Sequence, residues 1–108
     1  MKIQFKVWLE KDNLVLFGEG RKQLLQAIED QGSLAQAAKK MSMSYRAAWG
    51  RLKASEGRLG FPLAEKDTSQ GKKGGLHLTP KGKALLDQYT VIHRAMEKLV
   101  DQLERKIF

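Results

Sequence analysis

The sequence predicts an α+β fold, mainly α, that begins with a β-hairpin and ends with a long helix. Three observations support this: alternating apolar residues near the N-terminus, capped amphipathic segments in the middle, and heptad spacing at the end. The 108 residues, 42% of them hydrophobic, suffice for a single domain with a small core. We divide this domain into a hairpin over 1–18, a central unit over 21–83 and a C-terminal helix over 79–108.

The N-terminal segment has the period of two that is typical of a strand with one buried face. Lys11–Asn13 then supplies residues that favour a turn, and Leu14–Phe17 is apolar enough for a returning strand. We expect Gly18 and Gly20 to end this strand before a helix begins. The alternating apolar positions are Ile3, Phe5, Val7 and Leu9.

Two helices are expected next, and each has recognisable end signals. The first covers about Arg21–Gln31 and stops at Gly32, a residue type that ends helices in the left-handed conformation. Ser33 is then placed as the N-cap of a short helix over Leu34–Met41. Gln36, three positions after the serine, completes a capping-box pattern.

A third helix follows after a brief turn at Ser42-Met43. Ser44 is its expected N-cap, and the helix covers about Tyr45–Arg58 with Ala48 and Leu52 on its inward face. Two short helices joined by a tight turn, with another helix before them, form a helix-turn-helix. Small residues are needed where such helices cross, and the sequence supplies them at Ala37, Ala38 and Ala48.

The segment after these helices predicts a wing, that is, a hairpin with an extended tip. Short strands are expected near Leu63–Asp67 and Leu76–Leu78, with a tip over Thr68–Gly75 that holds three of the ten glycines together with Lys72 and Lys73. A nucleotide-phosphate loop is the alternative, but its Gly-x-x-x-x-Gly-Lys-Ser/Thr spacing is missing. The fold class is therefore a winged helix-turn-helix.

The net charge of +8 is concentrated in this central region. Residues 1–31 carry five basic and five acidic side chains, and residues 84–108 carry four of each. Residues 32–83 carry eleven basic and three acidic side chains. Clustered positive charge favours a polyanion partner, because each neutralised phosphate releases condensed counterions. The alternative is an ordinary solvated surface that happens to be basic.

Side-chain chemistry assigns roles on the third helix. Arg46 is the best candidate for a base contact, since its guanidinium fork matches guanine O6 and N7. Lys53 is expected at the DNA backbone, whereas Trp49 either faces DNA or packs in the core or a dimer interface, of which we favour packing. The expected DNA-binding residues are Ser42, Ser44, Tyr45, Arg46, Trp49, Lys53, Lys72 and Lys73. Weaker flanking contacts are expected at Arg58, Lys66, Lys81 and Lys83.

The C-terminal helix begins with Thr79 as N-cap and Pro80 at its first position. Its apolar residues then recur at intervals of four and three, which is a coiled-coil seam. This predicts a homodimer through the helix, with Trp8 and Phe17 of the N-terminal hairpin as a brace; the alternative is that the helix folds back on its own core. The seam residues are Leu85, Tyr89, Ile92, Met96, Leu99 and Leu103.

Several of these residues also carry a resemblance to a known family. Between about Arg21 and Tyr89 the sequence resembles the N-terminal DNA-binding domain of the molybdate-responsive regulator (ModE) family, and more distantly the LysR-type winged domain. A Gly/Lys-rich wing contributes to this resemblance. The other motifs are Gly32-Ser33-Leu34, Ala37-Ala38, Met43-Ser44-Tyr45-Arg46 with Ala48-Trp49, Leu59-Gly60-Phe61-Pro62-Leu63, and Leu78-Thr79-x-x-Gly82.

The resemblance implies a dimeric transcription regulator that binds double-stranded DNA. It places Ser44, Tyr45 and Arg46 on the DNA-facing helix and Lys72 and Lys73 on the wing. Full-length members of that family carry C-terminal oxyanion-binding domains, whereas this sequence ends within its last helix. An oxyanion effector such as molybdate or tungstate is therefore doubtful for this polypeptide.

Other function classes have little support in the sequence. The absence of cysteine removes thiolate metal sites, and His77 and His93 are isolated, so we expect no metal, no cofactor and no enzymatic activity. No signal peptide or membrane span is expected, which favours a soluble, cytoplasmic protein. The main alternative to a sequence-specific regulator is a nucleoid-associated protein without strong sequence preference; a protein-interaction module is the third.

Overall fold

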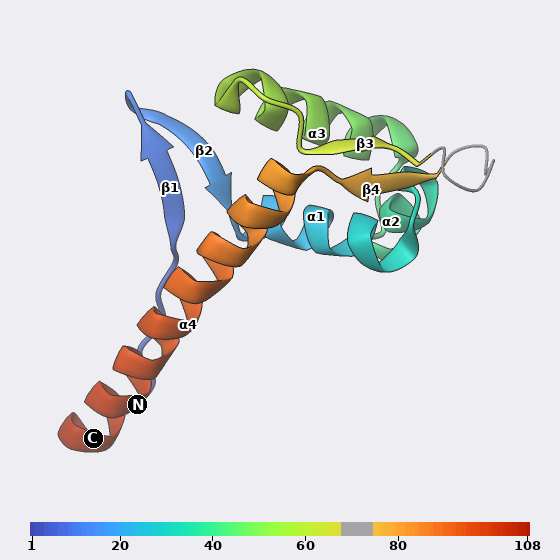
Figure 1. The fold of residues 1–108 in the computed structure, drawn as a ribbon. Helices are drawn as coiled ribbons and strands as arrows, with labels where there is room; N and C mark the ends of the chain where they lie inside the picture. The colour runs from blue at the N-terminus through green and yellow to red at the C-terminus, as the bar shows by residue number, and fades with distance from the viewer. Residues whose placement is uncertain (68–74) are drawn as a thin grey trace.

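In the computed structural model, which describes residues 1–67 and 75–108, two antiparallel β-hairpins accompany four helices. The first three helices form a compact group, and the last extends away from it (Figure 1). The α+β, mainly helical fold class is thereby confirmed. In chain order the elements are β1 (Trp8–Lys11), β2 (Leu14–Gly18), α1 (Glu19–Gln31), α2 (Leu34–Lys40), α3 (Tyr45–Leu59), β3 (Ala64–Lys66), β4 (Leu76–Leu78) and α4 (Pro80–Ile107).

The predicted helix ends are confirmed to within one or two residues. Gly32 ends α1 with φ 74°, in the left-handed region that favours glycine. Ser33 caps α2, its Oγ accepting a hydrogen bond from the Gln36 amide at 3.2 Å. The expected break at Gly20 is wrong, because α1 begins at Glu19 and includes this glycine in its first turn. Amides of a first turn lack intrahelical partners, so a glycine there does not interrupt the hydrogen-bond ladder.

The expected strand over the first ten residues is only partly correct. β1 starts at Trp8, because this residue pairs with Gly18, where β2 ends. The preceding segment is extended but lies against α4 instead of a strand. The Ile3 amide donates to Glu104 Oε1 at 2.8 Å, and the Tyr89 hydroxyl donates to the Val7 carbonyl at 2.8 Å. The alternation thus reflects one half-buried face whose partner, before β1, is a helix.

The core lies where α1, α2, α3 and the first turns of α4 meet. Phe17 and Tyr89 touch at its centre with ring centroids 5.4 Å apart in an edge-to-face arrangement. Phe17 is fully buried, so its expected role as a brace of a dimer is wrong. The buried apolar residues are Phe17, Leu24, Leu25, Ala27, Ile28, Leu34, Ala37, Ala38, Ala48, Leu52, Leu63, Ala64, Leu78, Leu86 and Tyr89.

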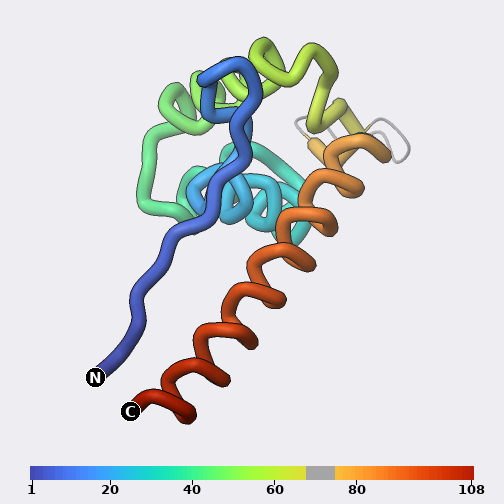
Figure 2. The backbone as a smooth tube through the Cα atoms, turned by 90° about the vertical axis from the view of Figure 1, so that its left-hand side faces the viewer, coloured from blue at the N-terminus to red at the C-terminus, as the bar shows by residue number. Residues whose placement is uncertain are grey.

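α4 begins as expected, with Pro80 in its first turn and Thr79 Oγ1 accepting from the Gly82 amide at 3.0 Å. At 1.5 Å per residue the helix is roughly 42 Å long, and it accounts for most of the 55 Å length of the molecule. Both views place the N-terminus and the C-terminus together at the far end of this helix (Figures 1 and 2).

Candidate nucleic-acid interface

The helix-turn-helix is built from α2 and α3, which cross through small side chains. Ala37, Ala38 and Ala48 are all buried at this crossing, as predicted, and their size allows the two helix backbones to approach closely. The turn between the helices is closed by hydrogen bonds from the Ser42 and Met43 amides to carbonyls of α2. Ser42 takes φ 54°, an uncommon conformation for a residue with a side chain.

The two predicted serines, Ser42 and Ser44, lie two positions apart just before α3, and both are exposed. Ser44 Oγ accepts from the Ala47 amide at 3.0 Å and so caps the helix. Because this bond uses only the oxygen, the hydroxyl hydrogen of Ser44 is left to donate. A phosphate oxygen beside the helix start is a suitable acceptor for that hydrogen.

The outer face of α3 carries the remaining predicted residues of this helix. Tyr45, Arg46, Trp49 and Lys53 are all exposed, while Leu52 is buried on the inner face. Arg46 lies about 200° around the helix from Ala48, so the helical period directs it away from the core. α3 therefore presents an aromatic and basic surface at its N-terminal half.

The sequence favoured packing of Trp49 in the core or in a dimer interface, and packing in the core of its own chain is wrong. Its side chain is 47% exposed, and the buried residues of α3 are Ala48, Leu52 and Ser55. Lys53 Nζ instead lies 4.4 Å from the centroid of the Trp49 ring, and 3.2 Å from Glu56 Oε1. The Glu56 carboxylate also accepts from the Leu63 amide at 2.7 Å. The Lys53 side chain is thus held along α3 by the Trp49 ring and the Glu56 carboxylate.

The hairpin expected to carry the wing is present as β3 and β4. Its register pairs Ala64 with Leu78 and Lys66 with Leu76. The Leu76 amide donates to the Gly32 carbonyl at 2.8 Å, which joins the hairpin to the end of α1. The tip over 68–74, with Lys72 and Lys73, lies outside the described residues.

The weaker flanking candidates have different surroundings. Arg58 donates from Nη1 to the Val15 carbonyl at 2.9 Å, and Lys83 Nζ lies 3.8 Å from Glu29 Oε1. Two further arginines, Arg51 within α3 and Arg21 on the neighbouring α1, were not singled out from the sequence. The spacing of seven between Arg51 and Arg58, which places both on one side of a helix, is the signal that could have found Arg51. No such spacing relates Arg21 to them, because it lies on a different helix.

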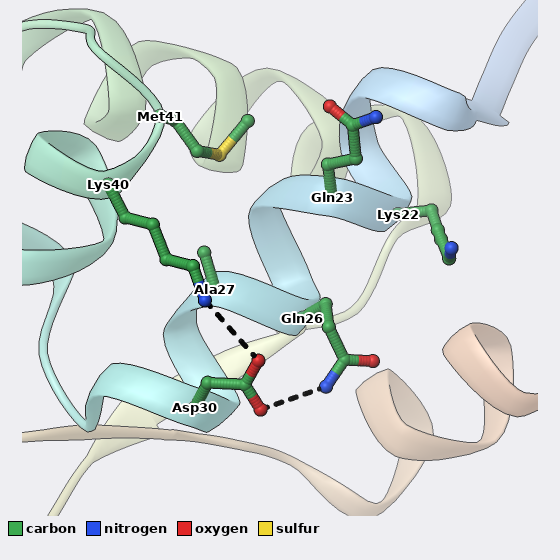
Figure 3. Close-up of a pocket in the computed structure, with 7 residues that line it drawn as sticks. All are labelled: Lys22, Gln23, Gln26, Ala27, Asp30, Lys40 and Met41. Atoms are coloured by element: carbon green, nitrogen blue, oxygen red, sulfur yellow. Dashed lines mark hydrogen bonds and ion pairs between the residues drawn. The ribbon is translucent and has the colours of Figure 1, made fainter.

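A hollow of about 320 Å³ lies between α1 and α2, away from the predicted residues (Figure 3). Two of its charged groups are paired: Lys40 Nζ is 3.9 Å from Asp30 Oδ2. Gln26 Nε2 also donates to Asp30 Oδ1 at 3.0 Å. In residues 1–67 and 75–108 no cluster of three or more metal-binding side chains occurs. Within the same residues, no helix is both long and apolar enough to cross a bilayer.

Comparisons with known proteins agree with this geometry. Transcriptional regulator ModE of Haemophilus influenzae is 38% identical over 71% of this chain and 30% of its own length. The molybdenum-pterin-binding protein MopB of Rhodobacter capsulatus is 33% identical over 83% of this chain and 33% of its own length. The chain thus spans about a third of the length of these curated relatives.

Solved structures add the likeness in three dimensions. The DNA-binding domain of CbnR in complex with DNA has 25% sequence identity and a TM-score of 0.63, over 83% of this chain and 99% of that one. The model of the bacterial regulatory helix-turn-helix proteins, lysR family, matches residues 21–83, the unit that holds α1, α2, α3 and the β3–β4 hairpin. This chain therefore belongs to the lysR family of bacterial regulatory helix-turn-helix proteins.

Proposed function

We propose that this chain binds double-stranded DNA sequence-specifically as a homodimer and thereby regulates transcription. The observation that carries the proposal is the outer face of α3, where Arg46 is exposed and, among the described residues, has no side-chain partner. A guanidinium that nothing in the chain engages is available for the fork-like contact with guanine. The lysR-family membership and the DNA complex of CbnR also support DNA binding.

In this proposal the N-terminal half of α3 enters the major groove, as recognition helices do. Arg46 reads a base edge and Tyr45 contacts a base or a phosphate. Ser42 and Ser44 donate to phosphates at the helix start, and Lys72 and Lys73 contribute charge from the wing. The Lys53 ammonium lies over the indole ring of Trp49. The two side chains therefore contact the DNA backbone together.

The homodimer is proposed on the basis of the second half of α4. Ile92, Met96, Leu99 and Leu103 form one apolar stripe there, and each is at least 37% exposed. Burying this stripe against a second copy removes it from water, which is the main source of free energy for such helix pairs. A twofold dimer would present its two α3 helices about 34 Å apart, one turn of DNA.

Selection of binding sequences from a random duplex pool tests the function. We expect enrichment of a pseudo-palindromic site that the protein binds roughly 1,000-fold or more tightly than random DNA. Arg46→Ala should cost about 1–3 kcal/mol on that site and relax specificity at one or two base pairs. Lys72→Ala should weaken all duplexes alike and lower the salt slope by about one.

The same titrations separate the competing functions. A nucleoid-associated protein would bind selected and random duplexes with a specificity ratio near one, and that result would remove the regulator. Loss of binding by Arg46→Ala to the same extent on both duplexes would remove its assigned role in base recognition. A protein-interaction module would show an affinity that does not respond to salt.

A further inference from the structure

Two arginines line a second hollow on the side of α3 that faces α1 and β2, and the charge of a third, Arg51, acts on one of them. The hollow has a volume of about 200 Å³ and lies between the end of β2, the start of α1 and the second half of α3. Arg21 and Arg58 line it together with Ser55. Arg51 lies one helical turn before Ser55 and two turns before Arg58, so it is on the same side of α3.

Hydrogen bonds hold the side chains of Arg21 and Arg58 without neutralising their charge. Arg21 Nε donates to Ser55 Oγ at 2.7 Å, and the same hydroxyl donates to the Arg51 carbonyl at 2.9 Å. Arg58 uses Nη1 on the Val15 carbonyl, which is a neutral acceptor. Each guanidinium has five N–H groups, so Arg21 and Arg58 both keep donors for another partner.

No carboxylate compensates this charge within residues 1–67 and 75–108. None of the three arginines forms an ion pair there, and no Asp or Glu lines the hollow. Glu19, which lies in the first turn of α1, points instead toward α4, with Oε2 3.3 Å from the Tyr89 hydroxyl and 4.0 Å from His93 Nε2. The segment 68–74 contains no acidic residue at all.

Positive charges that lie close together repel one another, so this arginine cluster is unfavourable unless an anion binds to it. Burial, and then the positive charges of Arg51 and Arg58, lower the pKa of Arg21 from its usual value. The guanidinium nevertheless stays charged at neutral pH, since an arginine pKa lies far above 7. Gly18 at the start of α1 offers no side-chain cap, so the amides of that first turn add to the positive potential.

We propose that Arg21, Arg51 and Arg58 form a binding site for a phosphate group beside α3. Arginine forks match phosphate oxygens in geometry and bind them with charge-assisted hydrogen bonds. The volume of the hollow is several times larger than the roughly 30 Å³ that one water occupies in the liquid. A phosphate group therefore fits. The phosphate comes either from a DNA strand that passes the second half of α3 or from the free ion. The DNA source rests on the proposed function, whereas the free-ion source does not.

Arg51→Gln is the most informative variant, because the Arg51 side chain makes no bond within the described residues and its loss should leave the fold intact. Arg94→Gln on α4 is the matched control, with the same change of charge on an exposed helix position. Arg94 lies about 200° around α4 from Ile92, so it also lies away from the apolar stripe.

The first arm titrates inorganic phosphate into the protein at constant ionic strength, with chloride as the reference, and follows backbone amides by NMR. We expect saturable shifts of Gly20 and Arg21 with phosphate only, and roughly tenfold weaker binding in Arg51→Gln than in Arg94→Gln. The second arm measures duplex binding against salt. A slope lowered by about one in Arg51→Gln but not in Arg94→Gln identifies the DNA backbone as the source.

The two arms together decide the proposal. Phosphate shifts no larger than those with chloride, combined with equal duplex binding of both variants, would overturn the site. If the wild-type protein bound no duplex, the proposed function would fail, and the NMR titration would still decide whether the three arginines bind phosphate.

Discussion

The two halves of α4 carry one continuous heptad pattern but have different surroundings. In the first half, which packs against α1, Leu86 and Tyr89 are buried, Tyr89 contacts Phe17 of β2, and Gly82 touches the backbone of Leu63. In the second half, Met96 and Leu99 are 38% and 47% exposed. The figures show why: the helix leaves the compact group of α1–α3 about midway along its length (Figures 1 and 2).

This difference shows that heptad spacing predicts which face of a helix is apolar, but not what covers that face. The fold-back alternative describes the first half of α4, whereas the second half keeps an exposed apolar stripe, on which the predicted dimer seam depends. Tyr89, which the sequence placed in the seam, is fully buried in the core of its own chain, whereas Ile92 is not. The two halves can therefore be perturbed separately.

The largest effect is expected in the first half, from Gly82→Ala. A Cβ at this position would overlap the Leu63 carbonyl oxygen, which belongs to a backbone that cannot rotate away. We expect the free energy of unfolding to fall by about 3 kcal/mol, as measured by urea denaturation. Gly50→Ala on α3 is the control, because a Cβ there meets nothing within 4 Å. It should stabilise the helix by up to about 1 kcal/mol, and equal effects of both substitutions would disprove the close packing of α4 on Leu63.

The second half is tested by Leu99→Gln. If the stripe is a dimer interface, a polar side chain there should weaken association by about 2–3 kcal/mol, which sedimentation equilibrium would detect as dissociation to monomers. The free energy of unfolding of the separated monomer should change little, because Leu99 is outside the core. Lys98→Gln, next to it on the same helix but off the stripe, should leave association unchanged. A wild-type protein that is monomeric at micromolar concentration would contradict the interface.

A smaller effect is expected elsewhere in the first half, from Tyr89→Phe. The phenol donates to the Val7 carbonyl, so its loss should cost about 1 kcal/mol of unfolding free energy. Burial, and then the nearby Glu19, raise the pKa of Tyr89 above its usual value of 10.0. The folded state therefore holds this proton more tightly than the unfolded state, and the resulting stability is complete below about pH 10 and is lost as the pH rises through the raised pKa.

Urea denaturation at about pH 8 and about pH 11 measures this difference. The wild-type protein should lose more stability between the two values than Tyr89→Phe does, since the variant has no phenol at this position. Identical losses in both proteins would show that the Tyr89 hydroxyl is not held by Val7 and Glu19.

Local signals predicted most of the central unit. Ser33, Ser44 and Thr79 all cap the helices they were expected to cap, and Gly32 ends α1. These features depend on bonds between residues three or four positions apart, so a short stretch of sequence contains both partners. The same reasoning brought Tyr45 and Arg46 to the exposed face of α3, because their positions follow from the helical period alone.

Features that depend on distant partners were predicted less well. The segment that contains Ile3 pairs with α4 instead of a strand, and Trp49 lies on the surface instead of in the core. Arg21 approaches Arg51 and Arg58 only because α1 crosses α3, so the positive hollow has no signature in any one segment.

The sequence by itself determined the helices, their caps, the basic central region and the apolar stripe of α4, because each of these follows from neighbours along the chain. The tertiary structure alone decided which part of that stripe is buried, what the N-terminal segment packs against and which arginines share a hollow. Those choices depend on contacts between residues far apart in sequence, and the free energy of such contacts is set by the shape of the packed core.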